Sequence, residues 1–204
     1  MLGTGRFRRM SASDWRAALP TLISRSVTLR EPGDQDLGVL VDVLSIADAS
    51  RFGLEFPVAE AAVAEFIARA RRERAAGESF TYVVVNAARV VVGIMQVRRL
   101  DPVFEAAEWE ATLAPSARGT GAFIEAARLV ASFAFATVGA HRLEARVLLQ
   151  NGRANSALRK IGAVQEGILR RSARRGDEYL DQALWSLLKD DWTERRVSTE
   201  PRVH

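Results

Sequence analysis

The chain has 204 residues, of which 48% are apolar, and a formal net charge of +4; this length and composition suit one domain with its own core. It contains no cysteine, which excludes disulfides, thiolate zinc sites and a cysteine nucleophile. His141 and His204 are its only histidines, so a histidine metal site or a Ser-His-Asp triad would rest on one residue, and the sequence favours neither. No apolar run approaches the ~18 residues that indicate a membrane span. Arginine supplies all but two of the 29 basic residues, which is compatible with a polyanionic partner but does not require one.

Residues 1–25 have the character of a flexible leader, because a basic opening precedes an apolar stretch that is too short and too interrupted for a signal-peptide core. An arginine-rich transit peptide is the alternative interpretation. The sequence predicts one domain over residues 26–192 and a polar tail over residues 193–204, with no internal repeat and no second domain. We expect a cytoplasmic protein that does not engage membranes.

Seven short apolar segments predict strands, and three of them, at 27–30, 108–113 and 142–149, alternate apolar with polar residues. The seven segments are residues 27–30, 80–85, 90–98, 108–113, 142–149, 164–169 and 179–187. Four other segments have apolar residues at helical spacing. They are residues 34–46, 58–76, 122–135 and 151–160, and Gly77 and Gly162 are expected to end the second and the fourth. Residues 48–57 are expected to form a loop, and residues 170–178 an arginine-rich connection between the last two strands.

In chain order these elements give β-α-α-β-β-β-α-β-α-β-β. Antiparallel strands lead into a strand–helix–strand unit, so we expect a mixed but mostly antiparallel sheet that is flanked by helices. The predicted fold class is therefore α/β (α+β).

The loop Arg118-Gly119-Thr120-Gly121 joins the strand at 108–113 to the helix that follows. Its glycines let the backbone approach a ligand closely, the first amides of the helix have no intrahelical acceptor, and the helix dipole adds positive potential. Arg118 adds a forked cationic donor that suits phosphate oxygens. The pattern is neither a P-loop nor the G-x-G-x-x-G dinucleotide fingerprint. Glycine pairs also precede helices that bind no phosphate, so the loop alone leaves both interpretations open.

Glu108 and Glu110 are two residues apart in the same predicted strand, so their side chains are expected on one face of the sheet. A partly buried carboxylate there would have a raised pKa and act as a general base, directly or through water. The alternatives are a solvated strand face and a salt bridge to an arginine. A β-bulge would change which of the two glutamates points inward.

The glycine loop resembles the Q/R-x-x-G-x-G/A signature of the GNAT acyltransferases. Arg118 and Gly121 match it, whereas Phe123 stands where that family usually has Gly or Ala. Residues 151–170 resemble the N-x-x-S-x-x-x-L-x-x-x-G-[FA]-x-x-E-G-x-L-R segment of the ribosomal-protein N-acetyltransferase branch. The matching residues are Asn151, Leu158, Gly162, Ala163, Glu166, Gly167, Leu169 and Arg170. The resemblance covers about residues 26–192.

This resemblance implies acetyl-CoA as the co-substrate, and no metal. Residues from Arg118 to Ala122 would hold its pyrophosphate. Free backbone groups near Thr112 and Leu113 would hydrogen-bond the pantetheine arm and polarise the thioester carbonyl. The side-chain amide of Asn151 would contact the same arm; the alternative role for Asn151 is a helix N-cap.

The implied activity is N-acetylation of a primary amine, with a protein N-terminal amine or a small amine metabolite as the acceptor. The resemblance implies no general acid, because Leu158 and Ala154 replace the Tyr and Ser that many relatives have. Those departures, and the arginine run within residues 170–175, leave a second class open: a catalytically silent GNAT-like module that binds RNA or the ribosome. Such a run is more often a solvated connection. A homodimer is also left open.

Overall fold

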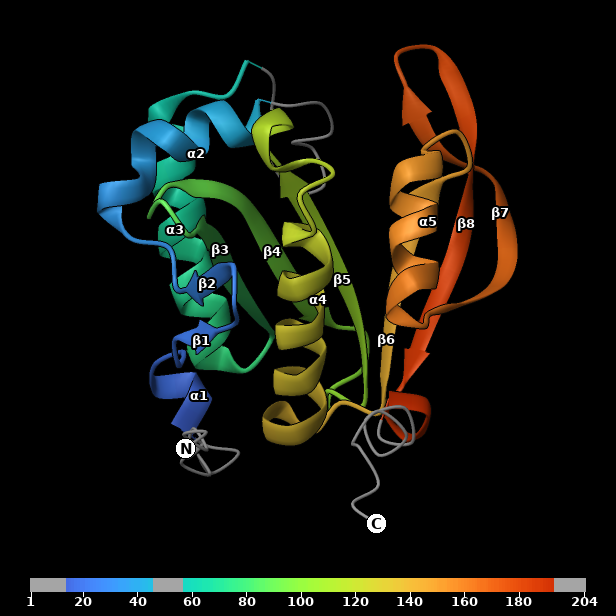
Figure 1. Cartoon of the computed structure of the whole chain (residues 1–204), viewed down its shortest axis with the longest axis horizontal. Helices are drawn as coiled ribbons and strands as arrows, with labels where there is room; N and C mark the ends of the chain where they lie inside the picture. Colours follow the sequence, from blue (N-terminus) through green and yellow to red (C-terminus); the bar gives the residue numbers. More distant parts are fainter. Residues whose placement is uncertain (1–13, 46–56, 193–204) are drawn as a thin grey trace.

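A computed structural model describes residues 14–45 and 57–192, and one mixed sheet runs through them (Figure 1). The strands are β1 (Leu22–Ile23), β2 (Val27–Arg30), β3 (Ser79–Asn86), β4 (Val91–Arg99), β5 (Ala106–Leu113), β6 (Arg142–Leu148), β7 (Val164–Arg175) and β8 (Glu178–Leu188). Their order in space is β1-β2-β3-β4-β5-β6-β8-β7. Every neighbouring pair is antiparallel except β5 and β6, which run parallel. The predicted sheet type is confirmed.

Helices cover both faces of the sheet. The α-helices are α1 (Asp14–Ala17), α2 (Leu37–Leu44), α3 (Glu60–Ala76), α4 (Ala122–Phe133) and α5 (Gly152–Ile161). Two short 3-10 helices, η1 (Asp34–Asp36) and η3 (Pro115–Ala117), and a π-helical segment, η4 (Ala134–Val138), complete the described helical segments. Helices α4 and α5 lie side by side in front of the sheet in Figure 1, and α2 and α3 cover its other face.

Each face of the sheet has its own apolar core, because successive side chains of a strand point to opposite faces. On β4, Met95 and Val97 belong to the core beneath α4, whereas Ile94 belongs to the core beneath α2 and α3. The core beneath α4 also takes in residues from α5 and β8, among them Leu158 and Trp185. The described residues of α2 and α3 pack mainly on β3 and β4, so these two helices leave the same face of β6 and β8 uncovered.

The predicted leader is wrong for residues 14–25, which belong to the fold. Trp15 is only 2% exposed and contacts Phe80 and Phe104 edge-on, with ring centroids 6.0 and 5.8 Å away. Leu22 is also buried, and β1 extends the sheet by pairing with β2. Burial of these two large apolar side chains stabilises the attachment of this segment. Residues 1–13 and the predicted tail at 193–204 lie outside the described residues, as does most of the predicted loop at 48–57.

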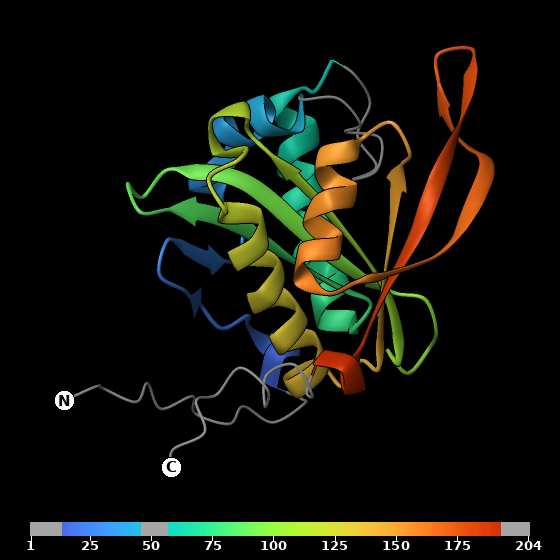
Figure 2. The ribbon, with the colours of Figure 1, turned by 45° about the vertical axis from the view of Figure 1, so that its right-hand side comes forward.

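The predicted connection at 170–178 is also wrong, because β7 continues to Arg175 and β8 begins at Glu178. Only Gly176 and Asp177 turn the chain, and the resulting hairpin projects beyond the rest of the sheet (Figure 2). The register of β7 against β8 shifts between Leu169 and Ala173. The irregularity has the character of a β-bulge, which interrupts the alternation from which the strand would have been predicted.

Candidate active site

Strands β5 and β6 pair at three positions and then separate. The paired residues are Ala106 with Arg142, Ala107 with Leu143 and Glu108 with Glu144. Beyond these, β5 stays on β4 as far as Leu113, and β6 stays on β8 as far as Leu148. Figure 1 shows the two strands diverging toward the N-terminal end of α4. The sheet is therefore split between β5 and β6.

The register between β4 and β5 decides which backbone groups face this split. At one end of the pair the Ala114 amide donates to Val92, and at the other the Leu100 amide donates to Ala106. Antiparallel ladders alternate between bonded and non-bonded pairs, so even-numbered residues of β5 turn their backbone groups to β4. Those of Ala111 and Leu113 turn to the split. The prediction is therefore wrong for the backbone of Thr112, which pairs with Ile94. The backbone of Leu113 faces the split, where its carbonyl oxygen lies 3.4 Å from the Arg118 Nε.

The glycine loop begins the helix in a conformation that only glycine adopts easily. Gly119 and Gly121 have φ values of +80° and +88°, in the left-handed region. Gly121 is the N-cap of α4, and its carbonyl accepts from the Glu125 amide at 3.1 Å. The helix geometry thus leaves the earlier amides without an intrahelical acceptor. The Ala122 amide alone lies near a local side-chain oxygen, at 3.3 Å from the Thr120 hydroxyl.

The space in front of this loop suits a phosphate group. A Cβ atom built on Gly119 or on Gly121 would meet no heavy atom within 4 Å, so both glycines border open space. Arg118 is exposed, and its Nε lies 3.4 Å from the Leu113 carbonyl oxygen, which holds the guanidinium beside the end of β5. Open backbone amides, a helix N-terminus and one arginine form an anion-binding arrangement. The predicted loop residues therefore fit a pyrophosphate.

A pocket opens from the split on the face that α4 and α5 cover. Most of its lining is apolar, which suits the pantetheine arm of a CoA thioester better than it suits a second charged group. The lining residues are Met95, Trp109, Glu110, Ala111, Phe123, Ala145, Arg146, Val147, Leu148, Asn151, Ala154 and Leu158. Phe123, the departure from the signature, thus lies at the wall of this pocket. We call it the α4-side pocket.

Asn151 lines the α4-side pocket and also caps α5. Its Oδ1 accepts from the Ala154 amide at 3.1 Å. This is the N-cap role, which the sequence offered as the alternative to contact with the pantetheine arm. The cap uses the oxygen of the side-chain amide, so its nitrogen has the geometry to donate to a ligand as well. The two roles are compatible.

A second pocket opens from the split on the opposite face. It is lined by Glu108, Glu110, Arg146, Leu148, Ser172, Ala173, Arg174, Arg175, Leu180 and Gln182. Glu108 and Glu110 face it together, as predicted, because β4 and β5 pair without a register shift. We call it the acceptor-side pocket, since it lies across the sheet from the glycine loop and helix α4.

The two pockets meet at the split. Glu110, Arg146 and Leu148 line both of them. One ligand can therefore approach from the face of α4 and another from the opposite face, and both reach Glu110. Two ligands that entered from opposite faces would meet at these shared residues, and such proximity is what direct group transfer needs.

The two glutamates differ in their surroundings. Glu108 forms an ion pair with Arg146, with 3.5 Å between its Oε1 and the arginine Nε. Glu108 thus faces the acceptor-side pocket as the partner of an arginine. Glu110 lies at the junction of the pockets, and its Oε2 is buried. Of the two predicted bases, Glu110 therefore has the better position.

Glu166, which the resemblance singled out, has a structural role at the paired end of the split. Its carboxylate accepts two hydrogen bonds from Arg142, at 2.8 and 2.5 Å, and one from Ser186 at 2.6 Å. The Arg142 guanidinium, and after it the Ser186 hydroxyl, lower the pKa of Glu166 to about 2. Arg142 also donates to Glu144, and Glu166 is the chief reason that the pKa of Arg142 is raised. The Arg142 cluster (Arg142, Glu144, Glu166 and Ser186) ties β6, β7 and β8 together.

Sequence reasoning missed Asn155 and Arg146. The Asn155 amide donates to the carbonyls of Leu148 and Asn151 and accepts from the Trp185 indole at 2.8 Å, so it fixes α5 to the end of β6. An Asn inside a helix is a poor helix former and could have signalled such bonds. No signal marked Arg146, because its role depends on the separation of β5 from β6.

The described residues contain no cluster of three or more His, Cys, Asp or Glu that could hold a metal ion. None of the helices in the described part of the chain is long and apolar enough to cross a membrane.

A sheet split between parallel strands, with a glycine loop opening a helix beside the split, defines an acyl-CoA-binding class of transferase. The profile of the family described as Acetyltransferase (GNAT) domain matches residues 26–164. The chain belongs to the GNAT acetyltransferase family, and its co-substrate is acetyl-CoA.

Solved structures share this fold. A probable acetyltransferase matches with a TM-score of 0.76 and 23% identity, over 86% of this chain and 100% of its own. Mycobacterium smegmatis RimJ in complex with CoA-disulfide matches with a TM-score of 0.74 and 21% identity, over 88% of this chain and 92% of its own. Spermidine N-acetyltransferase from Vibrio cholerae, in complex with CoA and spermine, matches with a TM-score of 0.71 and 18% identity, over 82% of this chain and 98% of its own.

Proposed function

We propose that this protein transfers the acetyl group of acetyl-CoA to the α-amino group of a protein or peptide N-terminus. The observation that carries the proposal is the meeting of the two pockets at Glu110, Arg146 and Leu148. The amine would enter through the acceptor-side pocket. The thioester would reach the same point through the α4-side pocket, beside the glycine loop.

Different residues would bind the cofactor and polarise its thioester. Arg118 and the backbone from Gly119 to Ala122 would hold the pyrophosphate, and Asn151 would donate to the pantetheine arm. The amides of Ala111 and Leu113 face the split and would polarise the thioester carbonyl. Acetyl-CoA supplies the activated acyl group as a thioester.

Glu110 would remove one proton from the entering ammonium group, directly or through water, and so leave a neutral amine. The amine nitrogen then bonds to the carbonyl carbon, and the carbon–sulfur bond breaks. The thiolate leaves with the electron pair and takes a proton from solvent, and the acylated nitrogen releases its one surplus proton to solvent, which leaves a neutral amide and a free thiol. A thiolate is a fair leaving group, so positioning can supply much of the acceleration without a dedicated general acid. The loss of the family Tyr and Ser at Leu158 and Ala154 is compatible with that reaction.

The charge of the acceptor-side pocket favours an α-amine over a polyamine or a lysine side chain. Three arginines and two glutamates line this pocket, which disfavours a ligand with several positive charges. A terminal α-amino group has a pKa of about 7.7–8.0, whereas a lysine ammonium has one of about 10.4. A much larger share of α-amines is therefore neutral at pH 7, and less proton removal is needed. We also propose that the protein acts in the cytoplasm.

An acceptor panel tests this function. A peptide with a free N-terminus would be compared with the same peptide acetylated at its N-terminus but carrying a lysine, and with spermidine. Because the chain has no cysteine, a thiol reagent reads the release of CoA without a protein background. We expect turnover with the free N-terminus and a gain of one acetyl group by mass spectrometry. Faster turnover with spermidine or with the lysine side chain would refute the α-amine proposal and select a small or side-chain amine.

A further inference from the structure

The three arginines that line the acceptor-side pocket indicate which kind of N-terminus it binds. Its three arginines come from two places: Arg146 from β6, and Arg174 and Arg175 from the end of the β7–β8 hairpin. Arg175 lies two residues after Ala173 along β7, and both line the pocket. Residues two apart in a strand share a face, so the Arg175 side chain lies on the pocket face. The hairpin therefore brings positive charge over the entrance through which the amine must pass.

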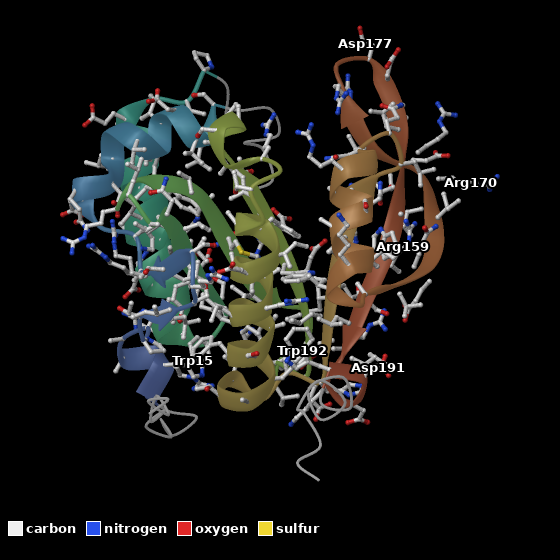
Figure 3. The ribbon with its side chains drawn as sticks, in the orientation of Figure 1. Trp15, Arg159, Arg170, Asp177, Asp191 and Trp192 are labelled. Carbon is white, nitrogen blue, oxygen red and sulfur yellow. The ribbon has the colours of Figure 1, made fainter. Side chains whose placement is uncertain are left out.

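Nearby carboxylates hold these arginines only loosely. The nearest atoms of Arg146 and Glu108 are the arginine Nε and the carboxylate Oε1, which lie 3.5 Å apart, and the Arg146 side chain is 45% exposed. Arg174 donates through Nε to the Gly176 carbonyl at 2.9 Å and lies 3.6 Å from Asp177, whose carboxylate is fully exposed at the tip of the hairpin (Figure 3). Glu178 is the residue opposite Arg175 on β8. Exposed pairs of this kind contribute about 0–1 kcal/mol, so an incoming anion can exchange with them.

Arg142 provides the contrast on the same face of β6. It uses Nε on Glu144 and both terminal nitrogens on Glu166, with distances of 2.5 to 2.8 Å. Its donors are thus occupied by protein carboxylates. The guanidinium of Arg146, four residues further along the strand, comes no closer than 3.5 Å to Glu108, and the Arg146 side chain is 45% exposed. A planar fork of this kind matches a carboxylate.

We propose that the acceptor-side pocket selects N-termini in which acidic side chains follow the α-amine. The inference rests on the proposed α-amine function, and it names the substrate class of that site. The amine lies at Glu110, while carboxylates of the next residues bind Arg146 and Arg175, and Arg174 adds positive charge at the rim of the pocket. Their negative charge also increases the rate of encounter with this entrance.

Three peptides of equal length test the proposal. They share an N-terminal serine and differ only at the second to fourth positions, which are all acidic (Asp, Glu), all amide (Asn, Gln) or all basic (Lys, Arg). For the unaltered protein we expect kcat/KM to be about tenfold higher for the acidic peptide than for the amide peptide, mainly through KM, and lowest for the basic one. The preference should shrink as salt is added, because charges near the surface are screened.

A pair of double variants assigns the preference to the pocket. Arg174→Gln/Arg175→Gln should reduce the ratio of acidic to amide peptide to about one. Arg89→Gln/Arg170→Gln also removes two positive charges, but from arginines outside the pocket, and should keep the tenfold ratio. Arg89 lies in the β3–β4 turn, and Figure 3 shows Arg170 on the outer side of the hairpin.

Failure of the acidic preference can be distinguished from failure of the α-amine function. If the amide peptide is acetylated but the acidic peptide gains no advantage, the acidic preference is wrong and the α-amine function stands. The acidic preference is equally wrong if the Arg174→Gln/Arg175→Gln variant retains it. If no peptide is acetylated although calorimetry shows that acetyl-CoA binds, the α-amine function fails, and the acidic preference fails with it.

Discussion

At the paired end of the β5–β6 split, Arg142 bonds to Glu144 and Glu166, and Ser186 completes the cluster. Four residues along the same strand, Arg146 makes one long ion pair with Glu108 and faces two pockets. The same side-chain types thus occupy both ends. The difference lies in their partners: Arg142 donates to carboxylates of β6 and β7 at 2.5 to 2.8 Å, whereas Arg146 lies 3.5 Å from the Glu108 carboxylate across the split. Where β5 and β6 pair, charges stabilise the sheet; where the strands separate, charges and backbone groups face the pockets.

The first prediction adds a negative charge at the open end of the split, where β5 and β6 have separated. Gly121→Glu places a carboxylate in the open space before the loop, where the pyrophosphate is expected. Repulsion between like charges should weaken acetyl-CoA binding by about 100-fold or more, measured by calorimetric titration. This is the largest effect we expect.

Gly139→Glu is the matched control. Gly139 also has a left-handed φ, of +99°, with no heavy atom near its Cβ position, but it lies at the other end of the α4–η4 helix. Both substitutions should cost roughly 1–2 kcal/mol of backbone strain. Only Gly121→Glu should lose binding, and equal losses in the two variants would attribute the effect to strain.

The second prediction separates the two glutamates of β5. Glu110→Gln should lower kcat by about 100-fold and leave acetyl-CoA affinity unchanged, because Glu110 would act only as the base. Glu108→Gln should lower kcat by less than about threefold, since Glu108 lies away from the junction and is paired with Arg146. Steady-state kinetics with a peptide acceptor measure both. The reverse order of effects would assign the base to Glu108.

The sequence predicted most of the fold and part of the site, and the failures have physical causes. Gly77 and Gly162 end α3 and α5 in the left-handed conformation, as predicted, because that requirement is local. The burial of Trp15 could not be predicted, since it depends on Phe80 and Phe104 far along the chain. The basic end of β7 was missed because exposed edge strands lack apolar alternation.

Within the site, the local sequence pattern predicts which side chains share a face, whereas the pairing of the strands decides which backbone groups are free. That Glu108 and Glu110 share a face follows from strand geometry alone, and the structure confirms it. Which of Thr112 and Leu113 has free backbone groups depends on the pairing of β5 with β4. No pattern within the strand carries that information, so both residues were predicted and only Leu113 faces the split.

The third prediction concerns a substitution that weakens the Arg142 cluster at the paired end of the split. Glu166→Gln should destabilise the fold at pH 7 by about 1 kcal/mol, a value well below the full linkage energy because the Glu166 side chain is 37% exposed. The folded-state pKa of Glu166 is lowered to about 2, so its contribution is present above the unfolded pKa of about 4.3 and disappears as the pH falls toward 2. Thermal unfolding from pH 7 to pH 3 should show the two proteins converging. Acetyl-CoA affinity should not change, and a large loss of affinity would connect the Arg142 cluster to the open end.

The smallest predicted effect concerns Asn151, which belongs to the open end through the α4-side pocket and to the scaffold through its cap. Asn151→Ser keeps an oxygen that can accept from the Ala154 amide but removes the side-chain N–H donor. We expect unchanged thermal stability and an acetyl-CoA affinity about fivefold lower, the value of one modest hydrogen bond. Asn151→Ala, which removes both groups, should cost about 1 kcal/mol of stability in addition. If Asn151→Ser binds acetyl-CoA as tightly as the unaltered protein, Asn151 serves only as a cap, and the cofactor contacts of the open end come from the glycine loop and the backbone of β5.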